Sequence, residues 1–356
     1  MLIDLQLNYP ILEGQEELFA RLSGQVLAEK TKSIMELPAC GGEDEQRQIA
    51  ATWLSRDHYE VSKERVLFCT GGHHAIMVVL LGLGLKGSRI AVDPLTYGNF
   101  KTQALSLGME LIPCAGDENG MRPDALRQAI STYGLRAVYL MPTIHNPLGI
   151  VMPKVRRDEI CQVASERDLF ILDDDAYNFL NENPPPSFAA LDPERGFSVW
   201  SFSKPFAPVM KLSFLTFPQR YREQFASMIR VTTSGAPALF AEMAITLIQS
   251  GALASLLRRK REEAARRQKL ARSILEGLDL QGHSASYHLW ITLPPDKPAH
   301  RIVQQLRFDG VLTSSSDVFR ANKGVKANGL RIALGCVRDP TILQEGLRKV
   351  RDRLIT

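Results

Sequence analysis

The 356-residue sequence has few cysteines, no long apolar run and no large excess of charge of either sign. Its five cysteines are odd in number and scattered, and neither a C-x-x-C pair nor any other metal-ligand spacing occurs. This pattern excludes a disulfide framework and argues against a structural metal site. We therefore expect a protein of a reducing compartment, the cytoplasm, with no bound metal ion.

The longest apolar stretch, residues 75–85, is too short to cross a bilayer. The first ten residues lack the basic and apolar regions of a signal peptide. The formal net charge of +4 is too small to indicate a polyanionic partner. The basic run at residues 258–261 is followed by glutamates and further arginines, which is typical of a solvated helix face. We therefore expect neither a membrane nor a nucleic acid as a partner.

Short apolar runs alternate with amphipathic stretches through most of the chain. They predict seven strands, at residues 65–70, 89–92, 110–113, 136–141, 169–173, 198–202 and 211–217. Helical patterns separate the first five strands, which indicates a parallel sheet covered by helices. The last two strands follow each other too closely for a helix between them, so one strand departs from the simple alternation.

The last third of the chain predicts a second, smaller α/β unit. A long helical pattern over residues 237–278 is interrupted near Gly251. Strand patterns at residues 285–293, 311–314 and 330–334 and helical patterns at residues 299–308 and 341–354 follow it.

A lysine follows the sixth predicted strand, after two alternating hydroxyl residues. The order Ser201-Phe202-Ser203-Lys204 places both serines on one face of the strand, because side chains alternate with a period of two. A lysine partly withdrawn from water loses proton affinity and becomes nucleophilic toward carbonyl groups. Taken alone, an ordinary surface lysine after a strand explains this pattern better.

Three aspartates, residues 173–175, end the fifth predicted strand and are followed by Tyr177. Adjacent carboxylates are unfavourable unless a cation lies nearby. Ligands bind at the carboxyl edge of a parallel sheet, and an aspartate beside a pyridine nitrogen would keep that nitrogen protonated. A metal site or a solvated acidic turn is the alternative, although no histidine cluster supports a metal.

A small-residue turn, Thr70-Gly71-Gly72-His73, joins the first predicted strand to an apolar helix. Small residues at this point let backbone amides approach a phosphate at the helix N-terminus. A Gly-Gly turn is weak evidence by itself. The neighbouring histidines do not form a metal pair, because adjacent residues on a helix diverge by about 100°.

Two further loops follow predicted strands. Residues 142–149 hold Asn146 before a proline, as a fixed hydrogen-bond donor, and residues 93–97 end in Tyr97. The tyrosine ring is placed where it can stack on a planar ligand. In isolation, a simple turn and a core-packing tyrosine explain these loops as well.

The order and spacing of these segments resemble those of the class I/II aminotransferases of fold type I, the aspartate aminotransferase superfamily, which use pyridoxal 5′-phosphate (PLP). The resemblance runs from about residue 34 to the C-terminus. It implies an α/β fold with a large PLP-binding domain at residues 42–244, built on a mostly parallel sheet covered by helices. It also implies a small domain made of residues 1–41 and 245–356, and a homodimer with active sites at the subunit interface.

The resemblance implies three catalytic residues: Lys204 as the Schiff-base lysine, Asp174 on the pyridine nitrogen and Tyr177 on the phenolic oxygen. Arg331, in the sequence NGLRIALG, would bind the substrate carboxylate through a bidentate fork. A salt-bridged strand residue is the alternative for this arginine. Asn146 and Asn8 would lie in the substrate site, where a loop-packing role for Asn8 fits equally well. The other residues implied to bind the cofactor are Tyr97, Asn146, Gly72, His73, Ser201, Ser203 and Lys211.

Three positions depart from the family pattern. Lys211 stands where an arginine is usual, and a lysine retains the charge but not the fork geometry. Residues 36–42 lack the tyrosine that reaches the phosphate of the other subunit, and Ser315-Ser316 replaces a Pro-Gly turn. These changes indicate a specialised member and leave the lysine, aspartate, asparagine and tyrosine set intact.

We therefore predict a PLP-dependent aminotransferase that moves the α-amino group of an amino acid to a 2-oxo acid through a Lys204 Schiff base and pyridoxamine phosphate. The alternative is another PLP-dependent reaction, namely elimination, replacement, cyclisation or oxidation, because all begin with the same carbanion. A binding module is a further alternative, as in bacterial regulators with an aminotransferase-like domain behind a winged helix, but we expect no such N-terminal domain here. A protein with an inert site would lack the visible absorbance of bound PLP.

Overall fold

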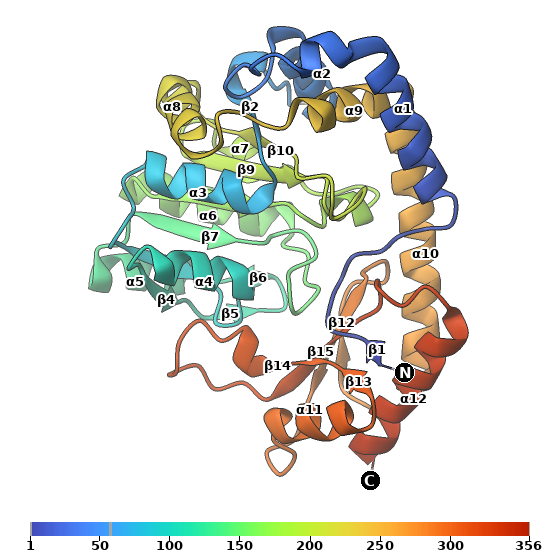
Figure 1. Ribbon diagram of the computed structural model, residues 1–356. Helices are drawn as coiled ribbons and strands as arrows, with labels where there is room; N and C mark the ends of the chain where they lie inside the picture. Colours follow the sequence, from blue (N-terminus) through green and yellow to red (C-terminus); the bar gives the residue numbers. More distant parts are fainter. Residues whose placement is uncertain (1, 57–58, 356) are drawn as a thin grey trace.

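The computed structural model describes residues 2–56 and 59–355, and its central element is a seven-stranded sheet (Figure 1). The strand order is β2-β10-β9-β8-β7-β3-β4, and β10 runs antiparallel to both of its neighbours while the other pairs are parallel. Each predicted strand overlaps one strand of this sheet, and β10 is the strand that departs from the alternation. The strands are β2 Val66–Cys69, β3 Arg89–Val92, β4 Glu110–Pro113, β7 Ala137–Leu140, β8 Phe170–Asp174, β9 Gly196–Ser201 and β10 Ser213–Thr216.

Helices cover both faces of the large sheet, because successive strand residues are apolar and point to opposite faces. Ile90 and Val92 of β3 pack into the core shared with α3 and α4, whereas Ala91 packs into the core shared with α5 and α6. The structure thus confirms the predicted covered sheet. The helices of this part are α2 Asp44–Leu54, α3 Gly72–Gly82, α4 Gly98–Ser106, α5 Pro123–Tyr133, α6 Lys154–Arg167, α7 Phe188–Leu191 and α8 Arg222–Thr233.

A second, four-stranded sheet has the order β11-β12-β15-β14 and its own apolar core (Figure 1). Its elements are β11 Leu280–Gln281, β12 His288–Thr292, α11 Ala299–Phe308, β14 Ser314–Ser315, β15 Gly329–Ala333 and α12 Pro340–Ile355. Beside it, β1 Ile3–Asp4 pairs in parallel with β13 Val311–Leu312. The smaller α/β unit is therefore present, while the exact domain boundaries stay a prediction.

Two helices follow α8 and carry the chain to the second sheet: α9 Ala238–Gln249 and α10 Ala252–Ile274. They meet at Gly251, whose φ of +71° suits glycine, so the predicted interruption is confirmed. The N-terminal α1 Gln15–Ile34 packs on α9. Short helical turns complete the fold at η1 Lys63–Arg65, η2 Asn178–Leu180, η3 Gln219–Tyr221 and η4 Ser316–Val318.

The basic run on α10 is not a uniformly solvated face. Arg258 and Arg259 are exposed, but Lys260 is completely buried. The prediction of a solvated face was wrong for Lys260, because one side of the helix packs against the segments around Lys204. Among the described residues, no single helix has the length and apolar composition to span a bilayer; α9 and α10 together, bent by 82°, meet these two criteria only.

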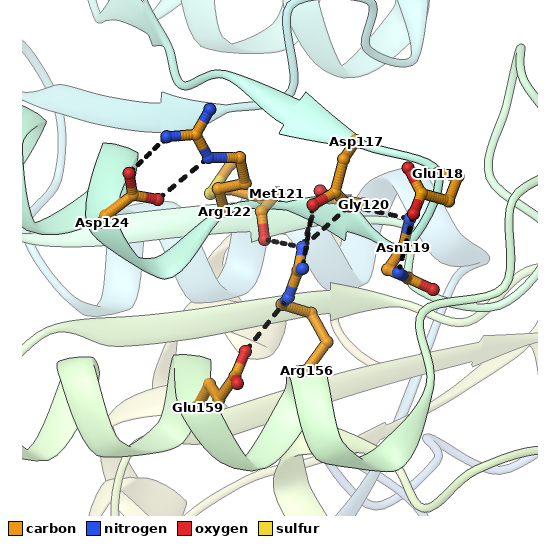
Figure 2. Close-up of polar contacts among 9 residues, drawn as sticks. All are labelled: Asp117, Glu118, Asn119, Gly120, Met121, Arg122, Asp124, Arg156 and Glu159. Carbon is orange, nitrogen blue, oxygen red and sulfur yellow. Dashed lines mark hydrogen bonds and ion pairs between the residues drawn. The ribbon is translucent and has the colours of Figure 1, made fainter.

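A hairpin of β5 Gly116–Asp117 and β6 Gly120–Met121 follows the edge strand β4. Arg156, at the start of α6, donates to both carboxylate oxygens of Asp117 at 3.0 and 2.9 Å (Figure 2). It also reaches the carbonyls of Gly120 and Met121 at 3.1 and 3.2 Å. One half-buried guanidinium thus fixes this edge of the large sheet.

Candidate active site

The predicted site segments meet because the carboxyl ends of five parallel strands lie at one edge of the large sheet. β2 ends before the Gly71-Gly72 turn, β3 before Tyr97, β7 before Asn146, and β8 and β9 at Asp174 and Ser201. The antiparallel β10 begins at this edge, so Lys211, two residues before it, joins the same group.

One cavity at this edge is lined by all ten residues that the sequence analysis assigned to the cofactor. They are Gly72, His73, Tyr97, Asn146, Asp174, Tyr177, Ser201, Ser203, Lys204 and Lys211. The cavity has six further lining residues: Tyr9, Thr70, Gly71, Ile76, Met141 and Ala176. Arg331 and Asn8 contact its wall rather than line it.

Lys204 lies in the turn after β9, with its amine inside the cavity wall. Nζ donates to the carbonyl of Asn8 at 2.9 Å and lies 3.4 Å from the centre of the Tyr9 ring. Burial, followed by the charge of Arg331, lowers the pKa of Lys204 to about 7. An amine with this pKa is partly unprotonated near neutral pH, which both a nucleophile and a proton carrier require.

Asp174, the last residue of β8, is buried beside the cavity. Its Oδ2 accepts a 2.8 Å hydrogen bond from the Tyr139 hydroxyl. Burial raises the pKa of Asp174 to about 6, and the bond from Tyr139 opposes this rise. The Tyr139 ring is itself fixed by stacking on Phe100, with centroids 3.5 Å apart. The sequence analysis missed Tyr139, although it shares a strand face with the lining residue Met141.

Replacing Tyr139 by phenylalanine is expected to raise the pKa of Asp174, because the lost hydrogen bond favours the ionised carboxylate. A bond to a charged group contributes about 1.5–3 kcal/mol, so a shift of about one to two pH units is expected. Activity that needs the carboxylate is lost as pH falls through this pKa. The acidic limb of the kcat/KM profile should therefore move to higher pH, and an unchanged limb would contradict the assignment.

Tyr177 and Asn146 form the side of the cavity that faces the second sheet. The Tyr177 hydroxyl accepts a 3.2 Å hydrogen bond from Nδ2 of Asn8, and burial raises its pKa to about 12. Asn146 is buried, and its Oδ1 accepts from Arg331 at 3.0 Å. Oδ1 of Asn8 is buried without a hydrogen-bond partner among the described residues. Tyr177, Asn146 and Asn8 thus place polar atoms at this wall of the cavity.

Arg331, on β15, is the cation on the side of the second sheet. Its guanidinium bonds to Asn146 and to the Gln6 carbonyl and lies 5.0 Å over the Phe319 ring. Within the described part of the chain it forms no ion pair, and its Nε has no partner. The alternative of a salt-bridged strand residue therefore does not hold, and the charge remains for a carboxylate ligand.

The opposite end of the cavity has the composition of a phosphate site. Gly71, with φ of +86°, precedes the first residue of α3, so the helix N-terminus opens on the cavity. A Cβ added at Gly72 would lie 3.5 Å from Cβ of Ser201, and one added at Gly71 would lie 3.8 Å from Cα of Lys211. The glycines thus leave a cradle that side chains would fill.

Tyr97 and His73 both line the cavity and contact each other. Nε2 of His73 and the Tyr97 hydroxyl are 3.0 Å apart, and the two rings stack with centroids 5.9 Å apart. Nδ2 of Asn99 donates to the same hydroxyl at 3.1 Å. The aromatic face of Tyr97 therefore has a fixed position.

The other two departures from the family pattern lie away from the cavity. Residues 36–42 follow α1, and Leu37 is 83% exposed. Ser315 belongs to β14, and the Ser316 hydroxyl donates to the Ala327 carbonyl at 2.9 Å. Neither segment lines the cavity, and the dimer that would bring a second chain to it stays a prediction.

Several relatives of this chain are known. The chain is 26% identical to the uncharacterized HTH-type transcriptional regulator YdeF of Bacillus subtilis, over 98% of the chain and 76% of YdeF. It spans only 59% of a second B. subtilis regulator of this type, YdfD, at 25% identity. It is also 25% identical to the 2-aminoadipate transaminase of Thermus thermophilus, over 96% of the chain and 86% of that enzyme.

Solved structures share the fold at low sequence identity. An archaeal alanine:glyoxylate aminotransferase has a TM-score of 0.88 at 22% identity, covering 100% of this chain and 91% of that chain. The Pyrococcus horikoshii kynurenine aminotransferase has a TM-score of 0.89 at 20% identity, covering 99% and 91%. The family model described as aminotransferase class I and II matches residues 3–350. The chain therefore belongs to the class I and II aminotransferases, which are PLP-dependent enzymes of fold type I.

Proposed function

We propose that this protein transfers the α-amino group of an amino acid to a 2-oxo acid. The observation that carries the proposal is the arrangement of three groups around one cavity. They are the Lys204 amine with its lowered pKa, the buried Asp174 carboxylate, and the Arg331 guanidinium, which has no ion pair among the described residues. These three charges match the groups that an amino acid and PLP present together.

The residues of the cavity fit PLP. Asp174 would lie at the pyridine nitrogen, and Tyr177 and Asn146 at the phenolic oxygen. The phosphate would bind at the N-terminus of α3, with the hydroxyls of Ser201 and Ser203 and the charge of Lys211. When bound, PLP supplies an electron sink for the substrate carbanion and a carrier for the amino group.

The protein's own residues then have separate tasks. Arg331 orients the donor through its carboxylate, and Lys204 takes the proton from the α-carbon. Its pKa of about 7 suits a group that must accept and return a proton near neutral pH. Asp174, as a carboxylate, stabilises positive charge on the ring beside it. The Tyr9 ring over the amine keeps water from that side of Lys204.

A donor panel tests the reaction type. The PLP-loaded protein is mixed with single amino acids and no acceptor, beginning with 2-aminoadipate and kynurenine, which the names of relatives suggest. Transamination is expected to release one equivalent of 2-oxo acid per site, with no ammonia, and to continue only when a 2-oxo acid acceptor is added. Continuous release of ammonia without acceptor would instead support elimination or oxidation, two of the alternative reactions.

Replacing Arg331 by methionine is expected to weaken donor binding through loss of the carboxylate contact. Charge-assisted hydrogen bonds contribute about 1.5–3 kcal/mol, which corresponds to a loss of about 10- to 100-fold in kcat/KM. Lysine at this position should recover part of the loss, because it retains the charge but not the fork. Steady-state kinetics with the best donor measures the effect. Unchanged kcat/KM in the methionine variant would exclude Arg331 from the substrate site.

A second candidate function is amino acid sensing without turnover. It is favoured by relatives named as transcriptional regulators and by Lys211 at the usual arginine position. A sensing domain would bind PLP and an amino acid but would release no 2-oxo acid when donor and acceptor are present together. The donor panel therefore separates the two functions.

A further inference from the structure

Lys260 lies in the middle of α10 and is fully buried, although no acidic side chain among the described residues forms an ion pair with it. Its Nζ donates to three backbone carbonyls, those of Pro10 at 2.7 Å, Lys204 at 3.0 Å and Phe206 at 3.1 Å. An ammonium group has three N–H donors and no acceptor, so the three carbonyls match it completely. The sequence pattern placed this residue only in the basic run at residues 258–261.

The three carbonyls belong to two segments that form the active site. Lys204 and Phe206 lie in the turn after β9, whereas Pro10 lies in the N-terminal segment. That segment returns to the catalytic amine: the Asn8 carbonyl accepts from Lys204 Nζ, and the Tyr9 ring lies over it. Lys260 thus joins the N-terminal segment to the turn after β9, within a few residues of the Lys204 amine.

Packing alone does not account for a lysine here. Burying a charge is costly, and a methionine would fill a similar space without that cost. Burial, with the charge of Lys204, lowers the pKa of Lys260 to about 7. The neighbouring cations on α10 point elsewhere, since Arg259 donates to the Glu13 carbonyl and Arg261 to the Phe179 carbonyl. Among the described residues, the hydrogen bonds of the Lys260 ammonium group all go to the three backbone carbonyls that it holds in place.

We propose that Lys260 is a positioning residue, which fixes the N-terminal segment of residues 8–10 against the turn of Lys204 and so sets the position of the Lys204 amine. Lys260 is not among the residues that line the cavity, so it acts through Lys204. The inference rests on the proposed function for its catalytic consequence, but the tie between the two segments is measurable without turnover.

The test compares Lys260→Met with Arg258→Met, an exposed cation on the same helix, both in the PLP-loaded protein. In Lys260→Met the segment of residues 7–12 should take up deuterium about tenfold faster, because the hydrogen bonds that hold it are lost. The amides of β8 should be unchanged. The pH titration of the visible band should shift, and KM for the donor should rise more than kcat falls. Arg258→Met should match the wild type in all of these.

Wild-type exchange in residues 7–12 and an unshifted pH titration in Lys260→Met would overturn the proposal. If the variant does not fold, the wild-type protein decides, because the tie requires the segment of residues 7–12 to exchange more slowly than a free peptide. Exchange of that segment at the rate of a free peptide would also overturn it. Faster exchange in Lys260→Met would support the tie even in a protein that fails to transaminate, so the two proposals fail separately.

Discussion

Lys204→Ala is expected to lack the visible absorbance of bound PLP and to lose turnover. The substitution removes both the amine that would hold the cofactor and the group that would move the substrate proton. Loss of a general base alone costs about 10²–10⁴-fold, so transamination should fall by at least about 10⁴-fold when the anchor is lost as well. The largest effect is expected here because one side chain has both tasks.

The measurement has two parts, an absorbance spectrum after incubation with PLP and the release of 2-oxo acid from the best donor. Lys269→Ala, an exposed lysine on α10, is the matched control and should behave as the wild type. Full activity in Lys204→Ala would refute the assignment of the catalytic lysine. A Lys204→Ala protein with the wild-type absorbance band would show that this band does not depend on the Lys204 amine.

Asp174→Asn is expected to lower kcat by about 10²–10³-fold, the usual cost of removing one preorganised charge-stabilising group. Asparagine has the same shape, and the Tyr139 hydroxyl can still donate to its oxygen, so the loss reports the charge rather than the packing. The Lys204 amine is untouched, so PLP should still bind and colour the protein. The single-turnover rate of 2-oxo acid formation isolates the step that needs the carboxylate.

Asp168→Asn supplies the comparison, because Asp168 ends α6 with a side chain that is 88% exposed. It should leave the single-turnover rate unchanged. A wild-type rate in Asp174→Asn would mean that Asp174 does not face the ring nitrogen. Asp173 would not replace it, since its Oδ2 accepts from the Phe188 amide and the Ser198 hydroxyl on the far side of the strand.

Local sequence pattern predicted the large sheet well. Its strands are short apolar runs, and the helices between them indicated that most of them run parallel. The ends of these strands also placed the cofactor residues at one edge, because parallel strands align their carboxyl ends. The pattern did not predict α1 and α2; in α1 only two apolar side chains, Leu22 and Val26, are buried. It also missed β1, whose two residues are too few for a periodic signal.

By itself, the sequence determined the family, the large sheet and the residues at the carboxyl edge of that sheet, since each depends on short runs of neighbouring residues. Only the tertiary structure decided which residues far away in the sequence contact these site residues. Tyr139 reaches Asp174 across two strands, Arg331 reaches Asn146 from the second sheet, and Lys260 reaches Lys204 from a helix 56 positions further along the chain. Such contacts arise because buried polar groups need hydrogen-bond partners, and the packed chain supplies these from segments far away in the sequence. The periodic pattern of neighbouring residues contains no information about such long-range contacts.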